Sequence, residues 1–209
     1  MVVPGADGRR LYYQVKGVPT FNVNGALGRL GGGARENATR TYESYITSID
    51  KALATAPAAD VKVQATRTGS QITVTAKASS LPPNASDLRF HVVLAERQLA
   101  FSGENGIRHH AMVVRAVAGD KGAGIPIPGS SDATVDHTFD LSQIKTDVET
   151  TVADEIARRR KTQNAALTPP DYRAEGRAMT AINPDALVVV AFVQDAAKNV
   201  LQAARVNVK

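Results

Sequence analysis

The sequence predicts an α+β protein, mainly β, in which an immunoglobulin-like antiparallel β-sandwich follows a hairpin and a helix. Two observations predict this class. One stretch before residue 58 carries apolar residues at spacings of three and four, which is the period of a helix. After residue 59 apolar and polar residues alternate instead, in short runs separated by turn residues, and such runs are typical of a sandwich. We therefore expect two parts, residues 1–58 and residues 59–209.

The first part begins with a short strand over residues 17–25, which follows the segment 11–16. Asn24-Gly25 is a strong signal for a tight hairpin, so a second strand is expected to return over residues 26–30. A helix should then cover about residues 35–55, with one buried apolar stripe formed by Ala38, Tyr42, Tyr45, Ile46, Ile49 and Leu53. The segment around Pro57 supplies a linker.

The second part contains the predicted strands of the sandwich. They cover residues 61–64, 72–76, 88–96, 111–118, 134–141, 187–194 and 200–208. A helical insertion is expected near residues 142–163, because Ile144, Val148, Val152 and Ile156 repeat every four residues. Asp140 and Gln143 have the spacing of a capping box at its start.

Composition excludes several classes of function. The chain has no cysteine, so it has no disulfide framework, Cys-ligated zinc or thiol nucleophile of its own. No apolar run approaches the roughly 20 residues that span a bilayer, and the N-terminus lacks the order of a signal peptide. The net charge of +5 is diffuse. Its one dense run, residues 158–161, ends a predicted helix, where cations complement the helix dipole, so no nucleic-acid partner is expected.

The histidines and carboxylates form no motif for metal binding or catalysis. His109 and His110 are adjacent, so a strand places them on opposite faces, and the sequence has no His-x-x-x-His or Glu-x-x-His spacing. We expect structural histidines, no metal, no cofactor and no catalytic residues. The segment 102–115 is the best candidate for binding, because polar loops on rigid sandwiches often carry ligand contacts. The candidate residues in it are Glu104, Asn105, His109, His110 and Arg115. In the structural alternative, Glu96 pairs with Arg115 across neighbouring strands.

Several stretches carry a family resemblance. Residues 13–25, with Gly-Val-Pro-Thr ahead of Asn-Gly, resemble the cis-proline loop and hairpin of thioredoxin-like domains, and the helix 35–55 resembles their terminal helix. The stretches 90–96, 103–106, 109–115 and 189–195 are similar to bacterial outer-membrane and periplasmic proteins that join such a domain to a β-sandwich. The resemblance implies a cis bond before Pro19 and a periplasmic or secreted location. The Cys-x-x-Cys region of that family has no counterpart, so its redox activity is not carried over.

Two main functional hypotheses follow, and a third, a histidine metalloprotein, stays open as the alternative to structural histidines. The first is a non-catalytic binding or scaffolding module that acts through a protein partner. The second is the C-terminal part of a larger thiol–disulfide oxidoreductase-like protein whose active site lies outside this chain. The N-terminal hairpin exposes unpaired backbone, because the central strands of a thioredoxin sheet are missing. It is therefore expected to pair in a homodimer or, as the alternative, to dock on its own sandwich.

Overall fold

A computed structural model of the chain describes residues 3, 5–25, 29–30, 32–83, 85–100, 107–129, 132–162 and 180–209. The N-terminal elements are α1 (Ala6–Tyr12), β1 (Thr20–Phe21), β2 (Arg29–Leu30), the 3₁₀ turn η1 (Arg35–Asn37) and α2 (Ala38–Leu53). The remaining elements are β3 (Asp60–Thr68), β4 (Gln71–Ser79), β5 (Arg89–Ala100), β6 (His109–Val117), η2 (Asp120–Gly122), β7 (Ile125–Pro126), β8 (Ala133–Asp140), α3 (Leu141–Thr162), η4 (Pro184–Ala186), β9 (Leu187–Gln194) and β10 (Val200–Asn207).

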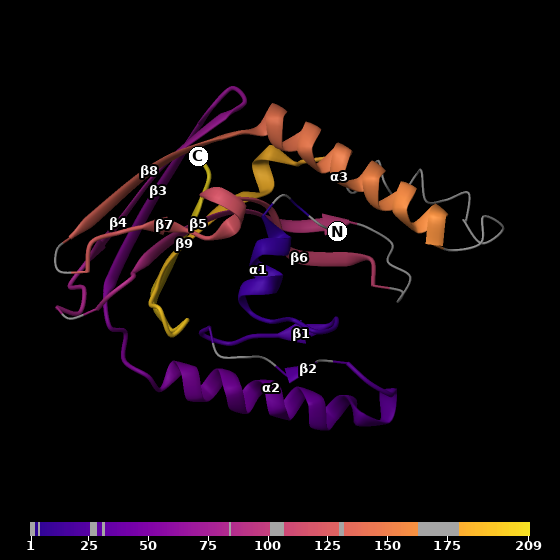
Figure 1. Cartoon of the computed structure of the whole chain (residues 1–209), viewed down its shortest axis with the longest axis horizontal. Coiled ribbons are helices and arrows are strands. Elements are labelled where there is room, and N and C mark those ends of the chain that lie inside the picture. The colour runs from indigo at the N-terminus through magenta and orange to yellow at the C-terminus, as the bar shows by residue number, and fades with distance from the viewer. Residues whose placement is uncertain are drawn as a thin grey trace.

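Two antiparallel sheets form the larger part of the molecule (Figure 1). One has the strand order β3-β4-β8, and the other has the order β10-β9-β5-β6, with the short β7 added to β5. If the strands are lettered in the immunoglobulin manner, the first sheet is A-B-E and the second is G-F-C-C′. The prediction of an α+β, mainly β fold with an antiparallel sandwich is therefore confirmed.

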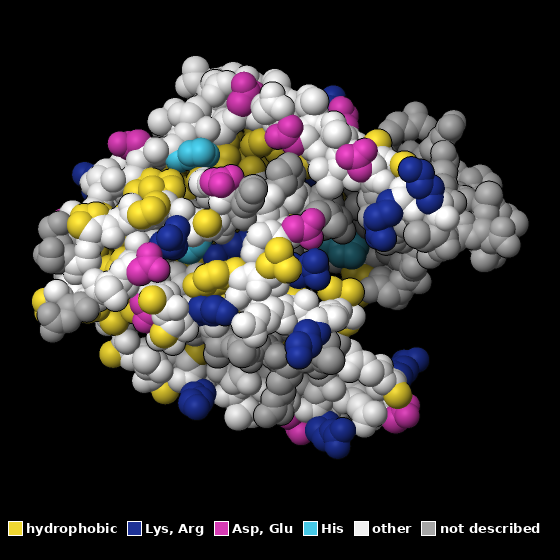
Figure 2. All heavy atoms as spheres, in the orientation of Figure 1, with side chains coloured by type: hydrophobic (Ala, Val, Ile, Leu, Met, Phe, Trp, Pro, Cys, Tyr) yellow, Lys and Arg dark blue, Asp and Glu magenta, His cyan; other side chains and the backbone are white. Residues whose placement is uncertain are grey.

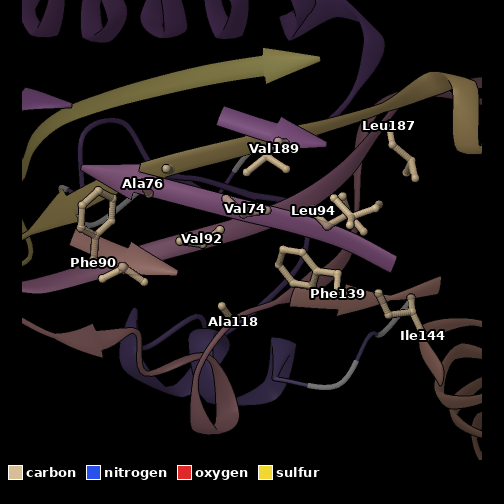
Figure 3. Packing of buried hydrophobic residues seen from close by; sticks show 14 of the residues in the cluster. Val74, Ala76, Phe90, Val92, Leu94, Ala118, Phe139, Ile144, Leu187 and Val189 are labelled. Carbon is tan, nitrogen blue, oxygen red and sulfur yellow. The ribbon is translucent and has the colours of Figure 1, made fainter. Parts of the chain in front are cut away.

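The core lies between these two sheets. The side chains of β4 alternate strictly, and Ile72, Val74 and Ala76 are fully buried, whereas the residues between them face solvent more. Figure 3 shows the inward side chains of β4, β5, β8 and β9 directed into one layer. Buried residues of the core cluster include Ile72, Val74, Ala76, Phe90, Val92, Leu94, Phe139, Leu187 and Val189. The period of two in the sequence thus becomes one buried face per strand.

The helix α3 sits in the connection between β8 and β9, where the sequence predicts an insertion. Ile144 and Val148 join the core cluster, so the start of the helix covers one end of the sandwich. Asp140 Oδ1 accepts from the Ser142 amide at 2.8 Å, which is an N-terminal cap. The side chain of Gln143 donates to Asp147 at 2.8 Å, and the predicted reciprocal box with Asp140 is therefore only half formed.

The N-terminal part differs from its prediction in three ways. First, α1 precedes the hairpin and has no counterpart among the predicted elements. Second, the described residues of β1 and β2 pair as Thr20–Leu30 and Phe21–Arg29, a register that a two-residue turn at Asn24-Gly25 cannot produce. The expected two-residue hairpin is thus wrong. Residues 29–30 do form a returning strand, whereas residues 26–28 of the expected strand lie outside the described residues. The Val18–Pro19 peptide bond is cis.

The third difference concerns α2. No residue of this helix is buried, so the prediction of a buried apolar stripe is wrong. Tyr42 is 64% exposed and Leu53 is 78% exposed. Its aromatic contact is Tyr45 against Phe21, with ring centroids 4.5 Å apart. Figure 1 shows that α2 lies across the β1–β2 hairpin from the sandwich, so the helix has a two-stranded ribbon beside it instead of one of the large sheets.

Nevertheless, the loop of the hairpin contacts the sandwich directly. The Val200 amide donates to the Asn24 carbonyl at 3.3 Å. A Cβ on Gly25, which has φ +82°, would lie 1.6 Å from the Lys198 carbonyl oxygen, so only glycine fits this approach. The turn between β9 and β10 thus holds the N-terminal segment. Among the described residues, no helix has the length and apolar character needed to cross a membrane.

Candidate functional site

A cavity of about 430 Å³ lies on the outer face of the five-stranded sheet, beside α1. This volume falls in the range of small-molecule sites in proteins, roughly 300–1,000 Å³. The walls come from the N-terminal segment, β5, β6 and β9, and most of them are apolar. The lining residues are Val3, Ala6, Arg9, His91, Val93, Leu99, His110, Val113, Val114, Val117 and Phe192. Among the described residues of the lining, the polar side chains are those of one arginine and two histidines.

The sequence of β5 explains why a cavity forms here. Phe90, Val92 and Leu94 face the core, and the alternate residues His91 and Val93 therefore face the other side of the sheet. Because this second face is also apolar, it needs a cover. The helix α1 and the 3₁₀ turn η2 provide part of that cover, and they pack against each other. The part that they leave uncovered is the cavity.

Arg9 on α1 is the charged residue in the described part of the cavity lining. Its Nη2 donates to Tyr13 Oη at 2.6 Å and to Gln194 Oε1 at 3.3 Å, while Nη1 lies 3.5 Å from His91 Nδ1. The guanidinium also lies 4.7 Å from the ring centroid of Tyr13 and 5.9 Å from that of Phe192. Burial lowers the pKa of Arg9, but an arginine pKa starts so high that the group stays cationic.

His91 is 2% exposed and stacks on Phe192, with centroids 4.7 Å apart. Burial, and next the positive charges of Arg9 and Arg89, lower its pKa to about 3. The imidazole is therefore neutral at physiological pH. Because arginine only donates, the contact with Arg9 requires an unprotonated Nδ1, which places the proton on Nε2. A Cβ on Gly124 would lie 2.5 Å from the His91 ring, so the neighbouring loop closes tightly over it.

The structure separates the five predicted binding residues. His110 lines the cavity, whereas His109 is exposed. Its Nδ1 lies 3.4 Å from Nε2 of Gln98. Glu104 and Asn105 lie outside the described residues. Arg115 is buried on the core side, away from this cavity.

Arg115 pairs with Glu96, as the structural alternative predicts. Its Nε and Nη2 both donate to Glu96 Oε2, at 2.8 and 2.6 Å, and Nη2 also donates to the Ala181 carbonyl at 2.6 Å. Leu94 pairs with Ala116 and Ala95 pairs with Val114, so Arg115 is the extra residue of a β-bulge. The guanidinium at this bulge thus binds the backbone of the segment that leads through η4 into β9. Binding of an external ligand by Arg115 is therefore not supported.

Sequence reasoning missed Arg9, Val117 and Phe192 as members of one site. They come from three elements, and a period within one element cannot show which elements will meet. The available signal was the run at residues 90–95, which is apolar on both faces and thus predicts that something covers each side.

The charges and histidines suggest no other kind of site. On the face in Figure 2, Lys and Arg side chains are interspersed with Asp and Glu and form no continuous basic patch. In the described part of the chain, no three His, Asp or Glu side chains gather in a way that could hold a metal ion. A second hollow of about 440 Å³ lies between residues 125–128 and 132–136. Several of its residues, including Pro126, Asp132 and Thr134, are exposed, so it is a weaker candidate.

Comparisons with known proteins add little to this description. No family model matches the sequence, and no curated protein matches it. Among solved structures, a β-glucosidase from Listeria innocua in complex with glucose aligns with 72% of this chain at 11% identity and a TM-score of 0.30. The alignment covers 16% of that enzyme. A score this low carries no conclusion about function, and the thioredoxin-like resemblance stays a prediction.

Proposed function

We propose that this protein is a non-catalytic binding module whose ligand occupies the cavity between α1 and the outer face of β5 and β6. The observation that supports the proposal most is the composition of the walls. Val93, Leu99 and Val117 provide apolar surface, while Arg9 and His91 contact each other within the same lining. Ligand sites in proteins combine a mainly apolar lining with a few convergent polar groups in this way.

A neutral apolar dye, N-phenyl-1-naphthylamine, tests the proposal. Its fluorescence should rise with saturable binding to the intact chain. Val117→Trp fills the cavity and should abolish the rise. Val114→Trp is a milder second variant, because Val114 is 37% exposed at the edge of the cavity and tolerates a larger side chain better. Circular dichroism establishes that each variant is folded.

Two controls separate the cavity from other apolar surface. Thr73→Trp adds the same side chain on the exposed face of β4, and Leu53→Ala removes exposed apolar surface from α2. Neither change should alter dye binding. The proposal is contradicted if the dye does not bind the native chain, or if it binds folded Val117→Trp and Val114→Trp with unchanged affinity.

The other functional predictions also remain proposals. A protein partner or a second copy of the chain is supported by the exposed side chains of Tyr42, Ile46 and Leu53 on α2. Sedimentation at several concentrations tests the second copy, and a monomer at all of them would contradict it. The alternative of a larger oxidoreductase-like protein, and with it a periplasmic or secreted location, rests on the family resemblance. A Cys-x-x-Cys region encoded upstream of Met1 would support it.

A further inference from the structure

The charge of Arg9 has no anionic partner in the described part of the chain. Salt bridges there join Arg10 to Asp7, Arg67 to Asp185, Arg89 to Asp87, Arg115 to Glu96 and Lys145 to Glu149, and Arg9 is in none of them. This is unusual for a half-buried arginine, since buried charges are normally paired. Arg115, the other arginine drawn into the fold, illustrates the rule through Glu96.

The groups that do contact Arg9 are all neutral. Tyr13 and Gln194 offer oxygen acceptors, and His91 offers an unprotonated nitrogen. These contacts use three of the five N–H groups of the guanidinium. Two N–H groups therefore have no hydrogen-bond partner among the described residues. The rings of Tyr13 and Phe192 also lie 4.7 and 5.9 Å from the guanidinium, so these contacts and the hydrogen bonds orient it before any ligand arrives.

The apolar walls begin next to this cation. Arg9 and His91 belong to the same lining as Val93, Leu99 and Val117. A ligand that fits both features has a negative group at one end and an apolar body. A carboxylate suits this guanidinium because it supplies the missing negative charge and accepts a charge-assisted N–H bond. Both Nη2 donors are already used by Tyr13 and Gln194, so the carboxylate would bind through one of the two remaining N–H groups, on Nε or Nη1.

We propose that the ligand is an amphipathic monocarboxylate, whose carboxylate binds Arg9 and whose apolar chain lies along Val93, Leu99, Val113 and Val117. This inference rests on the proposed function, because it names the ligand class of the same cavity. Phe192 and His91, which stack on each other, line the cavity beside Arg9. The neutral state of His91 matters here, since its ring adds no second charge that would favour a dianion.

Competition with the bound dye tests the ligand class. Decanoate, decanol and decylammonium share one chain and differ in the charge of the head group, and all are used below their micellar concentrations. Decanoate should displace N-phenyl-1-naphthylamine at the lowest concentration, decanol at a higher one and decylammonium at the highest. This ranking needs no variant, so it does not depend on whether a mutant folds.

Variants of Arg9 then locate the carboxylate. Arg9→Gln should weaken decanoate about tenfold or more and leave decanol nearly unchanged, because a charge-assisted hydrogen bond is lost only for the anion. Arg9→Lys should keep part of the preference for decanoate over decanol. Arg10→Gln is the matched control, since Arg10 is the next residue, is exposed and pairs with Asp7, and it should have no effect.

The outcomes distinguish the two proposals. If the dye does not bind the native chain, the binding function itself fails. If the dye binds and decanoate and decanol compete equally, the cavity is a binding site but the carboxylate inference is overturned. If Arg9→Gln lowers the affinity for decanoate and for decanol equally, the carboxylate inference is also overturned, because Arg9 would then shape the cavity instead of binding the charge.

Discussion

The sandwich and the helix α2 both follow clean apolar patterns, yet only the sandwich buries them. In β4 every second residue is buried to a few per cent or less, whereas in α2 the stripe residues Tyr42 and Leu53 stay 64% and 78% exposed. The difference lies in the partners. Each strand meets neighbours in its own sheet and a second sheet opposite, while α2 lies beside a hairpin whose described residues form two ladder pairs. A period in the sequence therefore predicts an element, but burial depends on what the rest of the chain supplies.

The two regions also differ in the polar contacts that join residues distant in the sequence. Within the sandwich, Arg115 and Glu96 form a buried ion pair. At the junction with the N-terminal segment, Arg9, Tyr13 and Gln194 form a half-buried set of hydrogen bonds. We expect the first to control global stability and the second to control the attachment of α1 and the shape of the cavity.

The largest expected effect comes from breaking the buried ion pair. Glu96→Leu should lower the free energy of unfolding by about 3–5 kcal/mol, because it leaves the Arg115 charge buried without its carboxylate. Urea denaturation measures the change. The double variant Glu96→Leu/Arg115→Leu should recover much of the loss, since two apolar side chains leave no charge unpaired. If the double variant is no more stable than the single one, the loss does not come from an unpaired charge on Arg115.

A smaller effect is expected where the two regions join. Gly25 and Gly69 both have positive φ, so alanine costs about 1–2 kcal/mol of backbone strain at either position. At Gly69 nothing lies near the new Cβ, whereas at Gly25 it would collide with the Lys198 carbonyl. Gly25→Ala should therefore cost more than Gly69→Ala and should also expose residues 12–25 to limited proteolysis. Equal costs and equal cleavage would mean that this turn does not anchor the segment.

The pH dependence of stability tests whether His91 is buried as a neutral imidazole. The pKa of His91 is about 3 in the folded state and about 6.5 in an unfolded chain, so the folded state binds fewer protons between these values. Stability should therefore fall as the pH drops below 6.5, by at most about 1.4 kcal/mol per pH unit. His91→Phe should flatten this slope between pH 6.5 and 5, as measured by urea denaturation. Identical slopes in both proteins would contradict a buried neutral imidazole.

The smallest effect is expected on α2. Leu53→Ala should change the free energy of unfolding by no more than about 0.5 kcal/mol, because an exposed side chain loses little on truncation. Phe90→Ala is the contrasting variant in the core and should cost about 3–5 kcal/mol. A large loss in Leu53→Ala would reveal a partner for α2, and repeating the denaturation at several protein concentrations would show whether that partner is a second copy.

The strands were predictable because their signal is local. Residues 187–194 were predicted as a strand with the bounds that β9 has, and the helix near 142–163 is α3 to within a residue at each end. The helix α1 was not predictable, because seven residues with two adjacent arginines carry no apolar stripe and form a helix only against η2 and the sheet.

The candidate site was predicted only in part. His110 was expected to bind and does line the cavity, but Arg9 and Phe192 join it through contacts between distant elements. For Arg115 the alternative of pairing with Glu96 could be derived from neighbouring strands. The bulge that turns its side chain into the core could not, since no residue in that run signals it.

Native-state hydrogen exchange tests the contrast between the two regions most directly. The amides of β4, β5 and β9 should exchange only through global unfolding, so that their exchange free energies equal the value from denaturation. The amides of α2 should exchange through local opening at a much lower free energy, and Phe90→Ala should destabilise the strands without changing α2. If the amides of α2 are as protected as those of β5 and lose that protection together with them, the sandwich and α2 form one cooperative unit and the account is wrong.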